Sequence, residues 1–137
     1  MLEGSKNLTY TENTVKILSA LNDESREQVE KLAEAYKDCP FIIAHSGMRS
    51  DEVRSEVVRV IKKCDNVFAD TAMSISHDGA IEWLVSKVGA DRVLFGTDIP
   101  WYDPGYGIGS VLFARISDAD KYKILYENAK GLATRVE

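Results

Sequence analysis

Residues 92–100 read RVLFGTDIP, and this stretch decides the fold that we expect for the chain. The apolar run at 93–95 has the composition of a β-strand buried on both faces. A glycine and a threonine follow the run, and then the carboxylate of Asp98. Functional groups in parallel α/β sheets lie at the carboxyl ends of strands, because the loops there converge on one crevice. Asp98 is therefore the first candidate for a functional side chain.

Two earlier apolar runs repeat this arrangement. Residues 41–44 (FIIA) precede His45, and residues 66–69 (NVFA) precede Asp70. Segments with apolar residues at helical spacing separate the runs, so strands and helices alternate along the chain. This alternation predicts an α/β fold with a parallel sheet of three strands. His45, Asp70 and Asp98 should then share one edge of that sheet.

The remaining segments are assigned from their spacing and their turn residues. Residues 99–109 combine proline, glycine and aromatic side chains, which predicts a loop long enough to cover a site. We divide the chain into a lead of unclear structure at 1–22 and a single βα domain at 23–137. Helices are predicted over 14–20, 24–37, 50–63, 77–88 and 117–130.

The composition argues against several classes of function. The 137 residues carry 17 basic and 22 acidic side chains, and the basic residues form no cluster that would suit a nucleic acid. Neither an apolar stretch of ~18 residues nor a signal peptide is present, so we expect a cytoplasmic protein with no membrane partner. Cys39 and Cys64 form neither a Cys-x-x-Cys pair nor a Cys/His cluster, which predicts reduced, unpaired thiols.

A histidine and carboxylates at neighbouring strand ends suit two tasks. They can bind a divalent metal, and they can move protons to or from a metal-bound water. Rigid strands favour such a site, since a metal tolerates only small errors in the position of its ligands. Plainer roles are also open: Asp70 could simply cap the loop after its strand, and His77 fits the start of a helix without a catalytic part.

Four segments together resemble the carboxyl-terminal part of the amidohydrolase-related metal-dependent hydrolases, the branch that also contains aminocarboxymuconate-semialdehyde decarboxylases. The segments are 40–47, 66–71, 92–100 and 127–129. The resemblance implies a partial (β/α)₈ TIM barrel, whose three strands correspond to the sixth, seventh and eighth. It also implies roles for two residues. His45 matches the histidine that contacts the reacting water or a second metal, and Asp98 matches the aspartate that binds the metal and handles the proton.

The chain also departs from that family. The family usually has a His-x-His pair on its first strand and another histidine, or a modified lysine, on its middle strands, whereas this chain has only His45 and His77. Met48 stands where a second glycine is common. A full barrel takes about 250 residues, so the resemblance implies the second half of one. A divalent metal, with zinc as the expected ion, would bind this chain alone weakly or not at all, because catalytic zinc normally takes three protein ligands.

The resemblance implies a metal-dependent hydrolase or decarboxylase that acts on a small molecule through a metal-activated water. His45 and Asp98 would serve as catalytic residues and metal ligands, and Trp101, Tyr102 and Asp70 would contact the substrate. The expected partner is a second copy of the chain or a complementing amino-terminal half. The alternative is a non-catalytic half-barrel module that assembles through its exposed strand edges, since uncovered apolar edges favour association.

Overall fold

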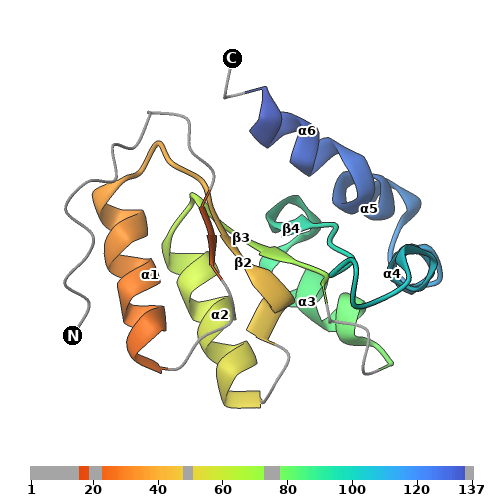
Figure 1. The fold of residues 1–137 in the computed structure, drawn as a ribbon, viewed down its shortest axis with the longest axis horizontal. Coiled ribbons are helices and arrows are strands. Elements are labelled where there is room, and N and C mark those ends of the chain that lie inside the picture. The colour runs from red at the N-terminus through yellow and green to blue at the C-terminus, as the bar shows by residue number, and fades with distance from the viewer. Residues whose placement is uncertain (1–15, 19–22, 48–50, 73–77, 135–137) are drawn as a thin grey trace.

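The computed structural model describes residues 16–18, 23–47, 51–72 and 78–134, and these include a four-stranded parallel sheet. The strands lie side by side in chain order, β1-β2-β3-β4 (Figure 1). Phe41 pairs with Lys16 on one side and with Val67 on the other, which fixes the register of the middle strands. The strands are β1 (Lys16–Leu18), β2 (Phe41–Ile43), β3 (Val67–Asp70) and β4 (Val93–Leu94).

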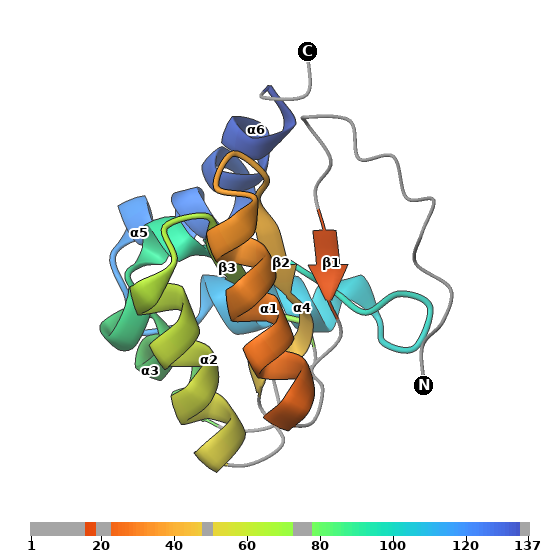
Figure 2. The same ribbon diagram turned by 90° about the vertical axis from the view of Figure 1, so that its left-hand side faces the viewer.

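Helices connect the strands and follow the last one. Helices α1, α2 and α3 lie side by side on one face of the sheet (Figures 1 and 2). The final helical stretch contains a π-helical turn between α5 and α6. The helices are α1 (Asp23–Ala35), α2 (Asp51–Lys63), α3 (Ala80–Val88), α4 (Pro104–Leu112), α5 (Asp118–Tyr122), the π-helical turn (Lys123–Glu127) and α6 (Asn128–Ala133).

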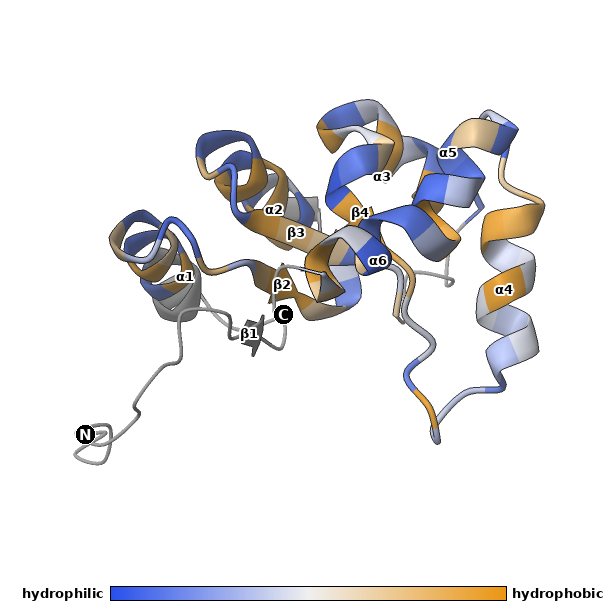
Figure 3. Ribbon diagram, turned by 90° about the horizontal axis from the view of Figure 1, so that it is seen from above, coloured by the Kyte–Doolittle hydropathy of each residue, from blue (hydrophilic) through white to orange (hydrophobic). Residues whose placement is uncertain are grey.

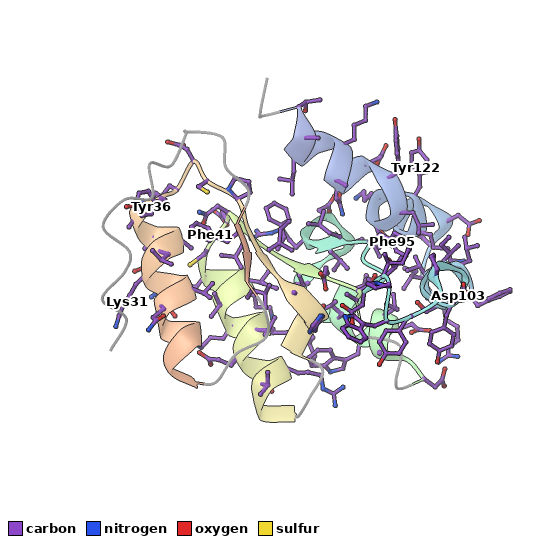
Figure 4. All side chains as sticks on the ribbon, viewed as in Figure 1. Lys31, Tyr36, Phe41, Phe95, Asp103 and Tyr122 are labelled. Atoms are coloured by element: carbon purple, nitrogen blue, oxygen red, sulfur yellow. The ribbon has the colours of Figure 1, made fainter. Side chains whose placement is uncertain are left out.

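Alternating residues of the strands divide the apolar core into two clusters. Figure 3 shows the apolar part of α2 turned toward β3, and Phe41 points into the layer between the sheet and these helices (Figure 4). The larger cluster includes Phe41, Ile43, Val67, Ala69 and Val93 together with residues of the helices. The smaller cluster consists of Phe68, Leu94 and Leu132, with Ile42 packed against it. Strands β2, β3 and β4 therefore have apolar side chains packed on both faces, as their composition predicts.

Side chains at the amino-terminal ends of the strands hold the connecting segments together. The Asn66 amide donates hydrogen bonds to the carbonyl oxygens of Ala33, Tyr36 and Cys39, at 3.1, 3.0 and 2.8 Å. The Arg92 guanidinium donates to the Cys64 carbonyl at 2.6 Å and to the Val67 carbonyl, from Nε, at 3.1 Å. These contacts stabilise the edge of the sheet opposite the candidate site.

The predicted α/β class and parallel sheet are confirmed, and neither Cys39 nor Cys64 forms a disulfide within the described residues. Two other predictions are wrong. Lys16–Leu18 form strand β1 rather than part of a helix over 14–20, because pairing with β2 outweighs the local apolar spacing. The sheet therefore has four strands rather than three, and its first strand lies within the predicted lead at 1–22.

The segment at 99–109 is only partly the loop that its composition predicts. Helix α4 starts at Pro104 inside it, and the Asp103 carboxylate caps this helix by accepting from the Gly105 amide at 2.7 Å. Helix α3 starts at Ala80 rather than at residue 77, and His77 lies outside the described residues. No helix in the described part of the chain has the length and apolarity that a membrane crossing requires.

Candidate functional site

The carboxyl ends of β2, β3 and β4 bring His45, Asp70 and Asp98 to one edge of the sheet, as the alternation of strands and helices predicts. His45 follows β2, Asp70 ends β3, and Asp98 lies four residues beyond β4. His45 Nε2 lies 3.5 Å from Asp98 Oδ1, with side chains that are 27% and 21% exposed. An imidazole and a carboxylate thus meet at a position that is partly exposed to solvent.

The backbone bends sharply where these residues lie. His45, Ser46 and Asp98 have φ angles of 64°, 43° and 59°, in the left-handed region that residues with a side chain rarely adopt. Such conformations persist only where surrounding contacts hold them, and they occur most often at functional sites. The turns redirect the chain directly after β2 and beyond β4, at the edge where His45 meets Asp98.

Asp70 connects the end of β3 to the turn after β2. Its Oδ1 accepts a hydrogen bond from the backbone N–H of His45 at 2.7 Å and another from the N–H of Ala72 at 3.1 Å. The Ser46 hydroxyl donates to the Asp70 backbone carbonyl. Burial raises the pKa of the Asp70 carboxyl to about 6; the His45 amide opposes this shift, and the nearby Asp98 charge adds to it.

Thr71 and Gly96 connect the ends of β3 and β4. The buried Thr71 hydroxyl accepts from the Gly96 amide at 3.0 Å and donates to the Gly96 carbonyl at 3.2 Å. A Cβ atom at position 96 would lie 3.1 Å from the Ala72 Cβ and 3.3 Å from the Asp70 Cγ. Glycine is therefore needed here for close approach, and the Asp70 carboxyl group packs directly against it.

Hydrogen bonds from the π-helical turn and from Asn128 hold β4 and the segments beside it in place. The Asn128 backbone N–H donates to the Lys123 carbonyl five residues earlier, which is the π-helical pattern. The Ile124 carbonyl accepts from the Phe95 backbone N–H at 3.1 Å. The Asn128 side chain donates to the carbonyl oxygens of Ala90 and Val93, each at 2.7 Å. Figure 4 shows Phe95 on the side of the sheet nearest this helical stretch. These contacts hold the strand that leads to Asp98.

Sequence reasoning missed Ser46, Thr71 and Asn128 as supports of the site. Ser46 and Thr71 each follow a candidate site residue directly, which was the available signal. The predicted substrate contacts Trp101 and Tyr102 lie after β4 and are 81% and 40% exposed. Their role, like that of Asp70 as a substrate contact, stays a prediction.

Other apolar side chains are exposed beside Trp101 and Tyr102. Helix α4 packs closely on the end of β4, since a Cβ at Gly107 would lie 3.6 Å from atoms of residues 95–97. The outer surface of this helix and of the loop before it exposes large apolar groups, coloured orange on α4 in Figure 3. We call these residues the apolar strip: Ile99, Trp101, Tyr102, Tyr106, Ile108, Leu112 and Phe113.

The donor set fits part of a metal site. Imidazole nitrogen and carboxylate oxygen are ligands that zinc and manganese accept, and His45 and Asp98 already hold these atoms 3.5 Å apart. Within the described ranges, no group of three or more His, Cys, Asp or Glu side chains could hold a metal ion. The two residues could therefore supply two ligands, and a catalytic zinc site normally takes a third.

Comparisons with known proteins agree with the α/β fold. The amidohydrolase family model matches residues 22–132. A TIM-barrel protein from Bordetella bronchiseptica superposes with a TM-score of 0.73 at 20% identity, over 91% of this chain and 47% of that one. A dihydroxybenzoic acid decarboxylase from Polaromonas, solved with manganese and 2-nitroresorcinol, has a TM-score of 0.61 at 21% identity, over 81% of this chain and 40% of that one.

A zinc-bound amidohydrolase from Burkholderia multivorans has a TM-score of 0.65 at 11% identity, over 88% of this chain and 52% of that one. No curated protein sequence is significantly similar to the chain. The structural matches establish the fold as part of a TIM barrel. The chain spans about half, or less, of the length of the three solved structures.

Proposed function

This chain belongs to the amidohydrolase family, and on that premise we propose that it forms the carboxyl-terminal part of a metal-dependent enzyme that hydrolyses or decarboxylates a small molecule. The proposal is carried by the 3.5 Å approach of His45 Nε2 to Asp98 Oδ1 at the carboxyl end of the sheet. Active sites of TIM-barrel enzymes lie at this end, because the βα loops converge there.

His45 and Asp98 would each supply one ligand to a divalent metal, zinc or manganese. A divalent metal at such a site lowers the pKa of a bound water, so that hydroxide is available near neutral pH. Asp98 could accept the proton that such a water would lose. If His45 contacted the water in place of the metal, it could orient that water or donate a proton to the substrate. Trp101 and Tyr102 would cover the substrate with aromatic surface, which suits a small cyclic or carboxylate compound.

The remaining ligands would come from the amino-terminal half of the barrel, whether in the same polypeptide or in a partner. Two observations support this. The chain spans 40% to 52% of three solved relatives, and the apolar strip leaves a large hydrophobic surface uncovered.

The test is to combine the purified chain with a family amino-terminal half that carries His-x-His. We expect zinc- or manganese-dependent turnover of a dihydroxybenzoate or a cyclic amide only when both parts are present. Asp98→Asn should abolish turnover without preventing assembly. A chain that binds zinc tightly and is active alone as a stable monomer would contradict the proposal.

The second candidate is a non-catalytic assembly module, which the apolar strip favours. Residues such as Trp101 and Phe113, 81% and 88% exposed, are typical of protein contact surfaces. This candidate predicts tight association with the complementing half, no metal-dependent turnover, and no effect of Asp98→Asn on any measured property. The same combination experiment therefore separates the two candidates.

A further inference from the structure

We propose that Asp70 is a positioning residue, which clamps the turn at His45 and Ser46 so that the His45 imidazole faces Asp98. This inference rests on the proposed function in one respect: the pair of His45 and Asp98 that the clamp positions is the proposed metal site. The clamp has two parts on one residue, the carboxylate Oδ1 and the backbone carbonyl oxygen.

The turn needs to be held from outside. His45 and Ser46 are consecutive residues with positive φ, and each carries a Cβ that makes this conformation unfavourable. Neither residue is a glycine, so the local sequence does not select the turn by itself. Contacts with a neighbouring element must offset the strain.

Asp70 supplies such contacts to both residues. It accepts the His45 N–H at 2.7 Å, a short bond strengthened by the charge of the carboxylate, and it accepts the Ser46 hydroxyl through its backbone carbonyl. Its own position is fixed, because Oδ1 also accepts the Ala72 N–H and the carboxyl carbon packs against Gly96. The clamp is thus rigid on the β3 side.

The geometry of the site depends on this clamp. The His45 imidazole reaches past the end of β3 to come within 3.5 Å of Asp98, so a small rotation of its backbone would displace Nε2 considerably. Removing an outer partner that orients a metal-binding histidine typically lowers metal affinity 10- to 100-fold. Asp70 should therefore act on the site through His45, in place of the direct substrate contact that the sequence predicts for it.

The test compares Asp70→Ala, which removes the carboxylate acceptor, with Asp70→Asn, which keeps an oxygen at the same place. We expect Asp70→Ala to move the His45 amide proton upfield in NMR spectra of the full chain and to speed its exchange with solvent. The zinc affinity of the protein complemented with the amino-terminal half, measured by calorimetry, should fall about 10- to 100-fold. Asp70→Asn should restore most of both properties. The matched control is Asp118→Ala, a 98% exposed carboxylate that should change neither.

Ser46→Ala removes the second contact alone and keeps the test decisive if Asp70→Ala does not fold. It should shift the His45 amide in the same direction by a smaller amount. An unchanged His45 amide in Asp70→Ala, or in Ser46→Ala when Asp70→Ala is not folded, would overturn the inference. If the unsubstituted chain and its complemented form bind no metal, the proposed function fails, and the His45 amide still decides the role of Asp70.

Discussion

The His45 imidazole lies 3.5 Å from the Asp98 carboxylate, although β3 separates the two strands that deliver these residues. The pair spans three strands, so its geometry depends on the end of β3 as well as on its own elements. Asp70 and Thr71 occupy that end, and they bind the turn after β2 and the segment after β4 respectively. The site is therefore a property of the sheet edge as a whole.

Asp98→Asn tests the metal role of this carboxylate. The substitution keeps the shape but removes the negative charge, so we expect zinc affinity to fall at least about tenfold, since carboxylates are preferred ligands over neutral amides. Calorimetric titration of the complemented protein provides the measurement. Asp103→Asn, at the cap of α4, is the control and should leave zinc affinity unchanged. Equal affinities for Asp98→Asn and the unsubstituted protein would remove Asp98 from the metal site.

Gly96→Ala should destabilise the fold by about 1–3 kcal/mol, because a methyl group would crowd Ala72 and the Asp70 carboxyl group. Gly109→Ala is the matched control inside α4, where the added Cβ would have no atom within 4 Å apart from its chain neighbours and the backbone of its own helix. That control should stabilise the protein by about 0.5–1 kcal/mol, since alanine favours the helix. Urea unfolding of both variants gives the comparison, and equal midpoints would show that a methyl group at position 96 does not destabilise the fold.

The raised pKa of Asp70 predicts a specific pH dependence of stability. The folded chain keeps the proton up to about pH 6, whereas the unfolded chain loses it near 3.8. The Asp70 carboxyl group therefore stabilises the fold below pH 3.8, and this contribution is lost as pH rises through about 6.

The Asp70→Asn variant provides the reference, because its side chain does not titrate. The unfolding free energy of the original chain, minus that of the variant, should decrease from about pH 4 through about pH 6 and level off above about pH 7. Urea unfolding at each pH measures it. A difference that does not change with pH would show that Asp70 titrates equally in both states.

Asn128→Asp should destabilise the chain more than Asn128→Ala does. Alanine leaves the carbonyls of Ala90 and Val93 without this donor, at a cost of about 1–3 kcal/mol. Aspartate additionally places a negative charge against those two oxygens. Thermal unfolding at pH 7 compares the variants; a more stable aspartate variant would mean that the amide does not hold β4 as described.

Phe113→Ser tests whether the apolar strip mediates association. The side chain is 88% exposed, so the unfolding free energy should change by no more than about 0.5 kcal/mol. Binding to the complementing half, or to a second copy, should weaken measurably in sedimentation experiments. Lys130→Ser, on α6 outside the strip, is the control. Unchanged association in Phe113→Ser would exclude this part of the strip from the interface.

Local composition was sufficient to predict β2, β3 and β4, because strands buried on both faces are almost continuously apolar. It also predicted the shared edge of His45, Asp70 and Asp98, since parallel strands must have their ends on the same side. Strand β1 was not predictable in this way. Its pairing with β2 joins residues 25 positions apart in the register Lys16 to Phe41, which no local pattern records.

The supports of the site escaped prediction for a similar reason. Ser46, Thr71 and Asn128 act through hydrogen bonds to backbone atoms of distant segments, and any polar side chain of suitable length could have that role. Helix α4 was not predicted because its glycines are typical of a loop, although Asp103 before Pro104 is a typical helix start. The sequence therefore contained the candidate catalytic groups but not the contacts that orient them.

The π-helical turn at Lys123–Glu127 makes the length of this segment more important than its composition. Deleting one residue would convert the turn to regular α-helix and rotate Asn128 by about 100° about the helix axis. Its amide would then turn away from Ala90 and Val93. Loss of a single codon here should thus be far more damaging than most exchanges of one amino acid for another, even though the segment lies at the back of β4, away from the site.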